Sequence, residues 1–171
     1  MNLYLIGLPG VGKSHFGKLL AEYLSWKFID LDSQIESSYG NSISHIFEHE
    51  GEGGFRVLEQ KALTEVSSLN ETVIATGGGT PCFYNNMEVM KHSGVTLYIK
   101  DDLSAIAQRL LSDRVKRPLF ASKTLEDCKM DLLNLLADRR SYYEQTHIIT
   151  GFGAFDHMHL LTNRLELFTK T

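Results

Sequence analysis

The residues with the clearest chemical signature form a glycine-rich stretch near the start of the chain. Residues 7–14 read GLPGVGKS and match the phosphate-loop pattern G-x-x-x-x-G-K-[ST] at every fixed position. Glycines bring several backbone N–H groups to one point, because they accept positive φ values and carry no Cβ. Lys13 can then reach the β- and γ-phosphates, and the Ser14 hydroxyl can bind Mg²⁺. The stretch predicts a site for a nucleoside triphosphate.

The surroundings of this loop predict a strand before it and a helix after it. Residues 2–6 form a short apolar run, and apolar residues recur at helical spacing from Phe16 to Leu24. The amides of the first helical turn add positive partial charge near the phosphates. A glycine-rich turn without function is the alternative, and the complete motif in this context disfavours it.

Two carboxylates follow the second predicted strand, which covers residues 27–30. Ligands of an open parallel sheet bind at the carboxyl ends of its strands, so we expect Asp30 and Asp32 to face the phosphate loop. Residues two apart in an extended chain point to the same side, which would direct both carboxylates there. The alternative is a solvated turn with an Asp as helix cap. Residues 33–36 match a capping box, which predicts that they open the next helix.

An arginine stands where helix electrostatics disfavour it. After the glycine-rich residues 51–54, a long helix is predicted to begin near Phe55, with Arg56 in its first turn. A cation there opposes the helix macrodipole, so it needs a partner. Binding of an anion is one explanation, and a surface ion pair with Glu59 is the other.

The third predicted strand, residues 73–76, ends in three consecutive glycines. Gly77, Gly78 and Gly79 would let a ligand approach the backbone closely, and an ordinary flexible turn is the alternative. This strand ends without an acidic residue, which leaves Asp30 and Asp32 as the carboxylates placed near Mg²⁺.

The order of the elements predicts an α/β fold. Strands and helices alternate along the chain, which specifies a parallel sheet with helices on both faces. We expect a three-layer α/β/α architecture with a central five-stranded parallel sheet, in one domain over residues 1–171. The remaining predicted elements are helices at 85–93, 103–111 and 124–143, strands at 95–99 and 147–149, and a closing helix from Asp156.

Helical periodicity stops at residues 112–123, a basic segment that contains Arg117. We expect it to form a mobile lid that brings positive charge over bound phosphates, and a solvated basic loop is the alternative. Arg139 and Arg140 come late in the following helix, where they could also complement its negative end.

Composition limits the classes of function. The chain has 171 residues, of which 43% are hydrophobic and 22% charged, as in ordinary globular domains. Its formal charge of −4 argues against nucleic acid as the main ligand. No apolar run approaches the roughly 18 residues of a membrane span, and we expect no membrane partner. Cys82 and Cys128 lack metal or disulfide spacing, so we expect thiols and a cytoplasmic location. The seven histidines show no metal-site spacing, so we assign no transition metal.

With these residues in hand, the sequence resembles the shikimate kinases over about residues 1–150. The phosphate loop alone is shared by many kinases, but the ordered combination with five further motifs is specific. The matching segments are residues 7–14, 30–32 with 35–36, Gly51 and Glu52 with Phe55, Arg56 and Glu59, 77–79, 117–119, and Arg139 four residues before Tyr143.

The resemblance implies the fold of the P-loop kinases, with a substrate-binding region at about 31–60 and a lid at about 112–123. It implies transfer of the γ-phosphoryl group of Mg-ATP to a ring hydroxyl of shikimate, giving shikimate 3-phosphate for aromatic amino acid biosynthesis, by a monomer. For catalysis the resemblance implies Lys13, Asp32 and Arg117, and for Mg²⁺ it implies Ser14 and Asp30. For the nucleotide it implies Gly10, Val11, Gly12, Lys13, Ser14, His15 and Arg109, with Arg109 contacting the adenine. For shikimate it implies Asp32, Arg56, Gly77, Gly78, Gly79, Arg139, Phe47 and Phe55. The segment 150–155 has no clear match to the adenine loops of the family.

The residues themselves point to the same class of substrate. Two arginines aimed at one anion and an Asp aimed at hydroxyls fit a small polyhydroxy acid better than a nucleoside. Two rival functions remain open: a gluconate- or nucleoside-monophosphate-type kinase, and a nucleotide-gated binding module without transfer activity. The second rival predicts a broken set of catalytic residues, whereas Lys13, Ser14, Asp30, Asp32 and Arg117 are all present.

Overall fold

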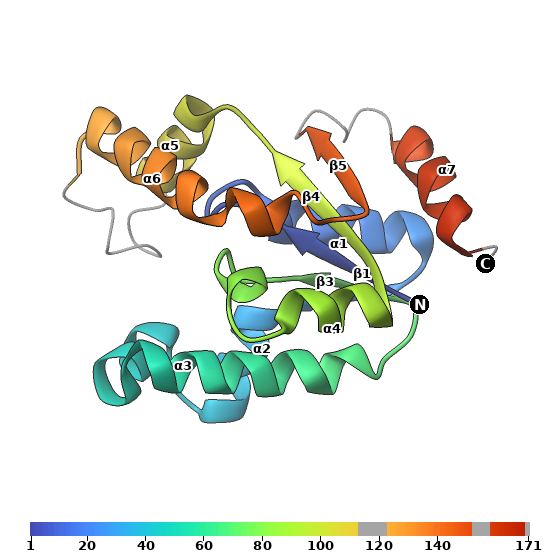
Figure 1. Ribbon diagram of the computed structural model, residues 1–171, viewed down its shortest axis with the longest axis horizontal. Helices are drawn as coiled ribbons and strands as arrows, with labels where there is room; N and C mark the ends of the chain where they lie inside the picture. Colours follow the sequence, from blue (N-terminus) through green and yellow to red (C-terminus); the bar gives the residue numbers. More distant parts are fainter. Residues whose placement is uncertain (113–122, 152–157, 170–171) are drawn as a thin grey trace.

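The computed structural model describes residues 1–112, 123–151 and 158–169. Within these ranges, five parallel strands form one sheet in the order β2-β3-β1-β4-β5 (Figure 1). The all-parallel sheet confirms the predicted fold class. The strands are β1 (Asn2–Ile6), β2 (Lys27–Asp30), β3 (Thr72–Ala75), β4 (Gly94–Lys100) and β5 (Ile148–Gly151).

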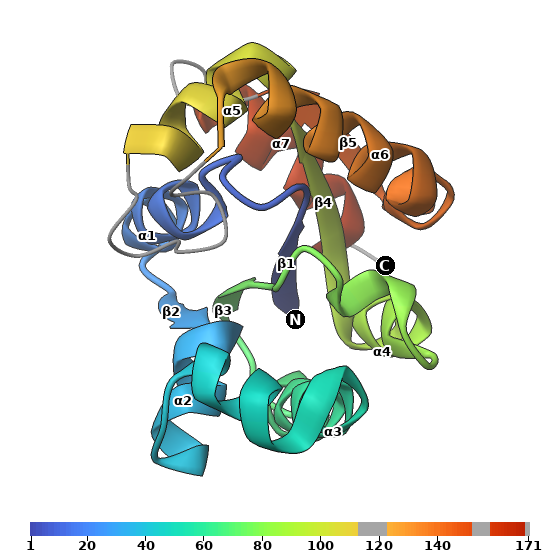
Figure 2. The ribbon, with the colours of Figure 1, turned by 90° about the vertical axis from the view of Figure 1, so that its left-hand side faces the viewer.

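Helices cover both faces of this sheet, as the alternating sequence predicted. α1 packs on β1, β2 and β3 from one face, and α4 packs on β4 from the other (Figure 2). Strand β1 is buried along its whole length, which explains why its residues are almost all apolar. The helices are α1 (Lys13–Leu24), α2 (Leu31–Tyr39), α3 (Ile43–Ser67), the short 3₁₀ helix η1 (Thr80–Cys82), α4 (Asn86–Ser93), α5 (Leu103–Ser112), α6 (Leu125–Tyr143) and α7 (Met158–Thr169).

Two helix starts differ from the sequence-based expectation. The prediction that residues 33–36 open the second helix was wrong, because α2 begins at Leu31 and Asp30 caps it. The long helix was predicted to begin near Phe55, but α3 is already helical from Ile43 and is interrupted only at Gly51, whose φ of 67° and ψ of −178° are not helical. The glycine break is therefore real, and helical structure resumes earlier than the apolar pattern suggested.

The C-terminal part of the chain is described only in pieces. Strand β5 includes Thr150 and Gly151, which were expected in a loop, because both pair with β4. The predicted helix start at Asp156 and most of segment 150–155 lie outside the described residues, as do residues 113–122 of the expected lid. Nothing in the described helices is long and apolar enough to cross a bilayer.

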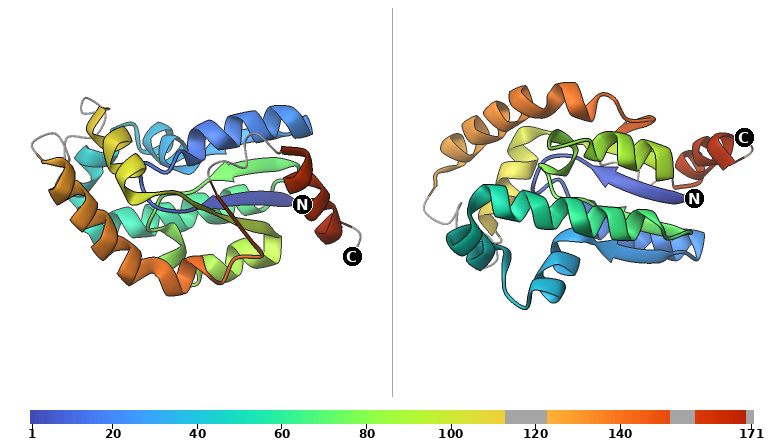
Figure 3. Two further views of the ribbon diagram at one scale, coloured as in Figure 1. Left: turned by 90° about the horizontal axis from the view of Figure 1, so that it is seen from above. Right: turned by 60° about the horizontal axis from the view of Figure 1, so that its bottom comes forward.

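The topology decides where a site can form. Helices α2 and α3 lie beside the β2–β3 edge of the sheet, and α5 and α6 lie beside the β4–β5 edge (Figures 2 and 3). The carboxyl ends of β1, β2 and β3 open between these two groups of helices. Side chains from α3 and α6 can therefore reach the same end of the sheet from opposite sides.

Candidate active site

The phosphate loop joins the carboxyl end of β1 to α1 in a conformation that requires glycine. Gly10 and Gly12 have φ values of 80° and 97°, in the left-handed region that side chains disfavour. A Cβ on Gly10 would also lie 2.6 Å from the side chain of Leu110. Lys13 is largely buried, and its Nζ donates to the carbonyls of Gly7 and Leu8 at 2.8 and 3.0 Å. The lysine is thus folded over the loop whose amides would bind phosphate.

Ser14 and Asp30 meet at the edge of this loop. The Ser14 hydroxyl donates to Oδ2 of Asp30 at 2.5 Å. Oδ1 of Asp30 accepts from the backbone N–H groups of Asp32 and Ser33 at 3.2 and 3.4 Å. Both readings of Asp30 hold, since it caps α2 with one oxygen and faces the phosphate loop with the other. A hydroxyl and a carboxylate oxygen side by side are a suitable ligand set for Mg²⁺.

Asp32 lines the same cavity of about 250 Å³ as Lys13, Gly77 and Gly78. It lies in the first turn of α2, so strand alternation was the wrong reason for a correct placement. Its side chain is exposed to solvent in this cleft. Even so, the pKa of Asp32 is raised to about 6. The main cause is the loss of part of its hydration, and the second is the negative charge of Asp30. Such a carboxylate can exchange a proton near neutral pH.

Arg56 forms a buried ion pair rather than a surface one. Its Nη1 donates to Oε2 of Glu59 at 2.8 Å, and Glu59 is fully buried. Its Nη2 also lies 3.1 Å from Oε1 of the exposed Glu52. The guanidinium carbon lies 4.0 Å from the centre of the Phe83 ring and 5.1 Å from that of Phe55. The arginine is therefore held in one place by two carboxylates and two aromatic rings.

The glycine run after β3 lies against both arginines. A Cβ built on Gly79 would lie 2.7 Å from Nη2 of Arg56, and one on Gly78 would lie 3.2 Å from Nη1 of Arg139. Tyr143 donates from its hydroxyl to the carbonyl of Gly78 at 2.6 Å. Burial raises the pKa of Tyr143 above its ordinary value, so the phenol remains a donor. Close approach, rather than flexibility, explains the glycines.

Comparison with known proteins agrees with this arrangement. The chain matches the family model of shikimate kinase over residues 9–154. It is 44% identical to a shikimate kinase of Azobacteroides pseudotrichonymphae genomovar. CFP2, with 86% of this chain and 88% of that protein covered. The chain belongs to the shikimate kinase family.

Solved structures of shikimate kinases superpose on the chain. The crystal structure of the enzyme from Bacteroides thetaiotaomicron has a TM-score of 0.92 at 32% identity, with 97% of this chain and 98% of that chain covered. The enzyme from Acinetobacter baumannii, solved in complex with shikimate, has a TM-score of 0.79 at 37% identity, with 87% and 82% covered. These matches support both the P-loop kinase fold and the kinase activity.

Arg109, for which similarity to shikimate kinases implied a contact with adenine, contacts the phosphate loop and Asp101 in the structure. Its Nη1 donates to the carbonyls of Gly10 and Val11 at 3.1 and 3.0 Å, and its Nη2 pairs with Asp101. The guanidinium thus supports the phosphate loop at the edge of the cavity that Arg109 and Lys13 both line. His15 lines the same cavity as Arg109 and Lys13.

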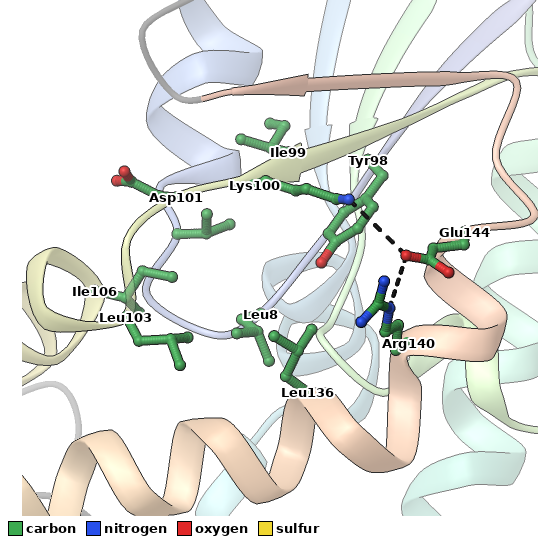
Figure 4. Close-up of a pocket in the computed structure, with 11 residues that line it drawn as sticks. Leu8, Tyr98, Ile99, Lys100, Asp101, Leu103, Ile106, Leu136, Arg140 and Glu144 are labelled. Atoms are coloured by element: carbon green, nitrogen blue, oxygen red, sulfur yellow. Dashed lines mark hydrogen bonds and ion pairs between the residues drawn. The ribbon is translucent and has the colours of Figure 1, made fainter.

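A second cavity, of about 220 Å³, lies on the other side of the phosphate loop (Figure 4). Leu8 and Val11 of the phosphate loop are among the residues that line it. At its rim, Glu144 pairs with Arg140 at 2.8 Å and with Lys100 at 3.9 Å. Val11 lines this second cavity and not the one that contains Lys13, so its predicted role in nucleotide binding would rest on its backbone N–H.

Sequence reasoning missed several residues that build the shikimate kinase site. Thr80 donates to Glu59, Phe83 stacks on Arg56, and Asp101 holds Arg109. None of them carries a motif signal, although Thr80 directly follows the glycine run and Phe83 comes three residues later. Arg117 lies outside the described residues. Phe47 and Phe55 stack with ring centres 4.7 Å apart within α3, the helix that carries Arg56.

Proposed function

We propose that Lys13, Asp32, Arg56, Arg139 and Arg117 carry out the phosphorylation of shikimate by ATP that family membership assigns to this chain. The observation that supports these roles best is the glycine run. Gly77 and Gly78 line the cavity of Lys13 and Asp32, whereas Gly78 and Gly79 contact the two arginines of α6 and α3. A phosphate site and an acid site thus share one short backbone segment.

The nucleotide end of the site would use the phosphate loop. Its amides and Lys13 bind the β- and γ-phosphates, and residues 10–15 line their path. Ser14 and Asp30 offer two adjacent oxygen ligands that fit Mg²⁺, with Asp30 acting directly or through water. When bound, Mg²⁺ neutralises charge on the transferred phosphoryl group. Arg117 would add positive charge from the segment 112–123.

The acceptor end would bind the carboxylate of shikimate through Arg56 and Arg139. Nε of Arg56 is buried and has no hydrogen-bond partner among the described residues, which suits an anionic ligand. Phe47 and Phe55 would form an apolar wall beside the ring, and Gly77, Gly78 and Gly79 would line the pocket. The solved structure of the Acinetobacter baumannii relative in complex with shikimate supports this substrate.

Asp32 would orient the attacking hydroxyl. Phosphoryl transfer passes through a loose transition state, so position matters more than full removal of the proton. The raised pKa of Asp32 lets it accept that proton as the bond to phosphorus forms.

We also propose a cytoplasmic monomer that binds no nucleic acid and no membrane, consistent with two free thiols and a net charge of −4. Size-exclusion chromatography with light scattering checks the oligomeric state.

A coupled assay of ADP release with shikimate, gluconate and AMP tests the function. Of the three acceptors, we expect only shikimate to be phosphorylated. Lys13→Met is the matched negative control and should release no ADP. Turnover with gluconate or AMP instead would assign the chain to a related kinase class. ATP binding without ADP release from any acceptor would indicate a binding module. Isothermal titration with shikimate, with and without nucleotide, measures acceptor binding independently of turnover.

A further inference from the structure

Thr80 is a buried residue directly after the glycine run, and its hydroxyl reaches the acid-binding end of the site. Its Oγ1 donates to Oε1 of Glu59 at 2.6 Å, and both side chains are fully buried. The other carboxylate oxygen of Glu59, Oε2, accepts from Nη1 of Arg56 at 2.8 Å. Each oxygen of the buried carboxylate therefore has its own donor, and the two donors fix its rotation.

Thr80 itself is held on both sides of its backbone. Its N–H donates to the carbonyl of Gly77 at 3.2 Å, and its carbonyl accepts from Nδ2 of Asn86 at 3.0 Å. Asn86 is fully buried at the start of α4. These two bonds fix the backbone of Thr80 to the end of β3 and to α4, so its hydroxyl donates from a fixed position.

The Thr80–Glu59 bond lies beside the groups assigned to the reaction. A Cβ on Gly77 would lie 2.9 Å from Oε1 of Glu59, 3.0 Å from Oγ1 of Thr80 and 3.1 Å from Oδ1 of Asp32. Three polar side chains from α3, η1 and α2 therefore crowd around one glycine. Without the hydroxyl of Thr80, Oε1 of Glu59 would be a buried acceptor without its donor, next to another carboxylate.

We infer that Thr80 is a positioning residue whose hydroxyl holds Glu59, so that Glu59 keeps Arg56 oriented for the carboxylate of the acceptor. The inference rests on the proposed function, because it assigns Arg56 to shikimate. Thr80 acts through Glu59 and does not itself touch the substrate. Its effect should therefore fall on acceptor binding and leave ATP binding unchanged.

The test replaces the hydroxyl by a methyl group of similar size in Thr80→Val. We expect the KM for shikimate, and its Kd by titration, to rise about tenfold, as for loss of a hydrogen bond to a charged group. The KM for ATP should stay within about twofold, because Lys13 and the loop are untouched. Thr80→Ser, which keeps the donor, should restore most of the acceptor affinity. If Thr80→Val does not fold, Thr80→Ala carries the same expectation.

A matched control separates positioning from general loss of a buried threonine. Thr72 is also fully buried, at the opposite end of β3, and its hydroxyl donates to the carbonyl of Asn70 at 2.9 Å. Thr72→Val should leave both KM values unchanged. An unchanged shikimate KM in Thr80→Val, an equal rise for ATP, or failure of Thr80→Ser to recover would overturn the inference. Absence of shikimate turnover in the wild-type chain would instead overturn the proposed function.

Discussion

Ser14 and Asp30 are joined by a 2.5 Å hydrogen bond between the first turn of α1 and the end of β2. In the sheet, β3 lies between β2 and β1, the strand that leads through the phosphate loop into α1, so the bond closes one side of the phosphate cavity. Because Asp30 also caps α2, one residue links nucleotide chemistry to the helix that carries Asp32. The two roles of Asp30 can be separated by substitution.

Asp30→Asn should impair metal use without unfolding α2. Asn caps helices as well as Asp does, but it lacks the negative charge that Mg²⁺ requires. We expect the Mg²⁺ concentration for half-maximal activity to rise about tenfold or more, as for the loss of groups that orient metal ligands. Asp30→Ala should show the same rise and also lose about 1 kcal/mol of stability with the cap. Magnesium titrations and thermal melts measure the two effects, and an unchanged Mg²⁺ requirement in Asp30→Asn contradicts the metal role.

Asp32 should set an acid limb in the pH–rate profile. Its pKa of about 6 reflects lost hydration and then the charge of Asp30, with Glu59 and Glu36 adding to the shift and Lys13 opposing it. We expect kcat/KM for shikimate to fall about tenfold per pH unit below pH 6, as the required carboxylate takes up a proton. Asp32→Asn should lower turnover by more than about 10²-fold and abolish this limb.

His15 provides the control for that profile, because it lines the same cavity as Asp32. His15→Gln should keep the acid limb. If the limb disappears in His15→Gln and persists in Asp32→Asn, the assignment to Asp32 is wrong.

Asp32→Asn should also make the protein more stable at neutral pH. The folded state holds the proton of Asp32 with a pKa of about 6, against about 3.9 in an unfolded chain. This group therefore stabilises the fold most below about pH 4, and that contribution is lost as pH rises through 6. Water in the cleft screens the carboxylate, so we expect a gain of only about 1 kcal/mol at pH 7.5, or about 2–4 °C in Tm. Melts at pH 7.5 and pH 4.5 should show the difference shrinking at the lower pH, and an equal difference at both would argue against a charge effect.

The sequence was informative where chemistry is encoded locally. The phosphate loop, Asp30, Asp32 and the glycine run could each be read from residue types next to a predicted strand, and the parallel sheet then brought them to one edge. Asp32 shows the limit of that reasoning, because its placement comes from the first turn of α2 and not from strand alternation. Helix caps depend on which side chain reaches which N–H, and both Asp30 and Ser33 were plausible caps in the sequence.

Contacts between distant elements could not be predicted in this way. Arg109 reaches the carbonyls of Gly10 and Val11 across about a hundred residues of sequence, and no local pattern encodes that contact. The roles of Thr80 and Phe83 could not be predicted because their partners, Glu59 and Arg56, lie on another helix. Such residues become visible only when burial and donor geometry are known.

Gly79→Ala tests whether the glycine run is required for the space it leaves to Arg56. The backbone of Gly79 has φ of −92° and ψ of −17°, which alanine adopts without strain. The added methyl group would nevertheless lie 2.7–3.0 Å from the guanidinium of Arg56. Displacing that guanidinium strains its buried pair with Glu59. We therefore expect the free energy of unfolding to fall by about 1–3 kcal/mol and the KM for shikimate to rise.

Gly53→Ala is the matched control for the same substitution. Gly53 lies within α3, and a Cβ there would meet nothing within 4 Å. Alanine should stabilise this helix by about 0.5–1 kcal/mol and leave the KM for shikimate unchanged. Equal KM values in Gly79→Ala and wild type would mean that Arg56 either moves freely or does not bind the acceptor. Titration of Arg56→Ala with shikimate then decides between these cases. The affinity falls if Arg56 binds the acceptor, and it stays at the wild-type value if Arg56 is not involved.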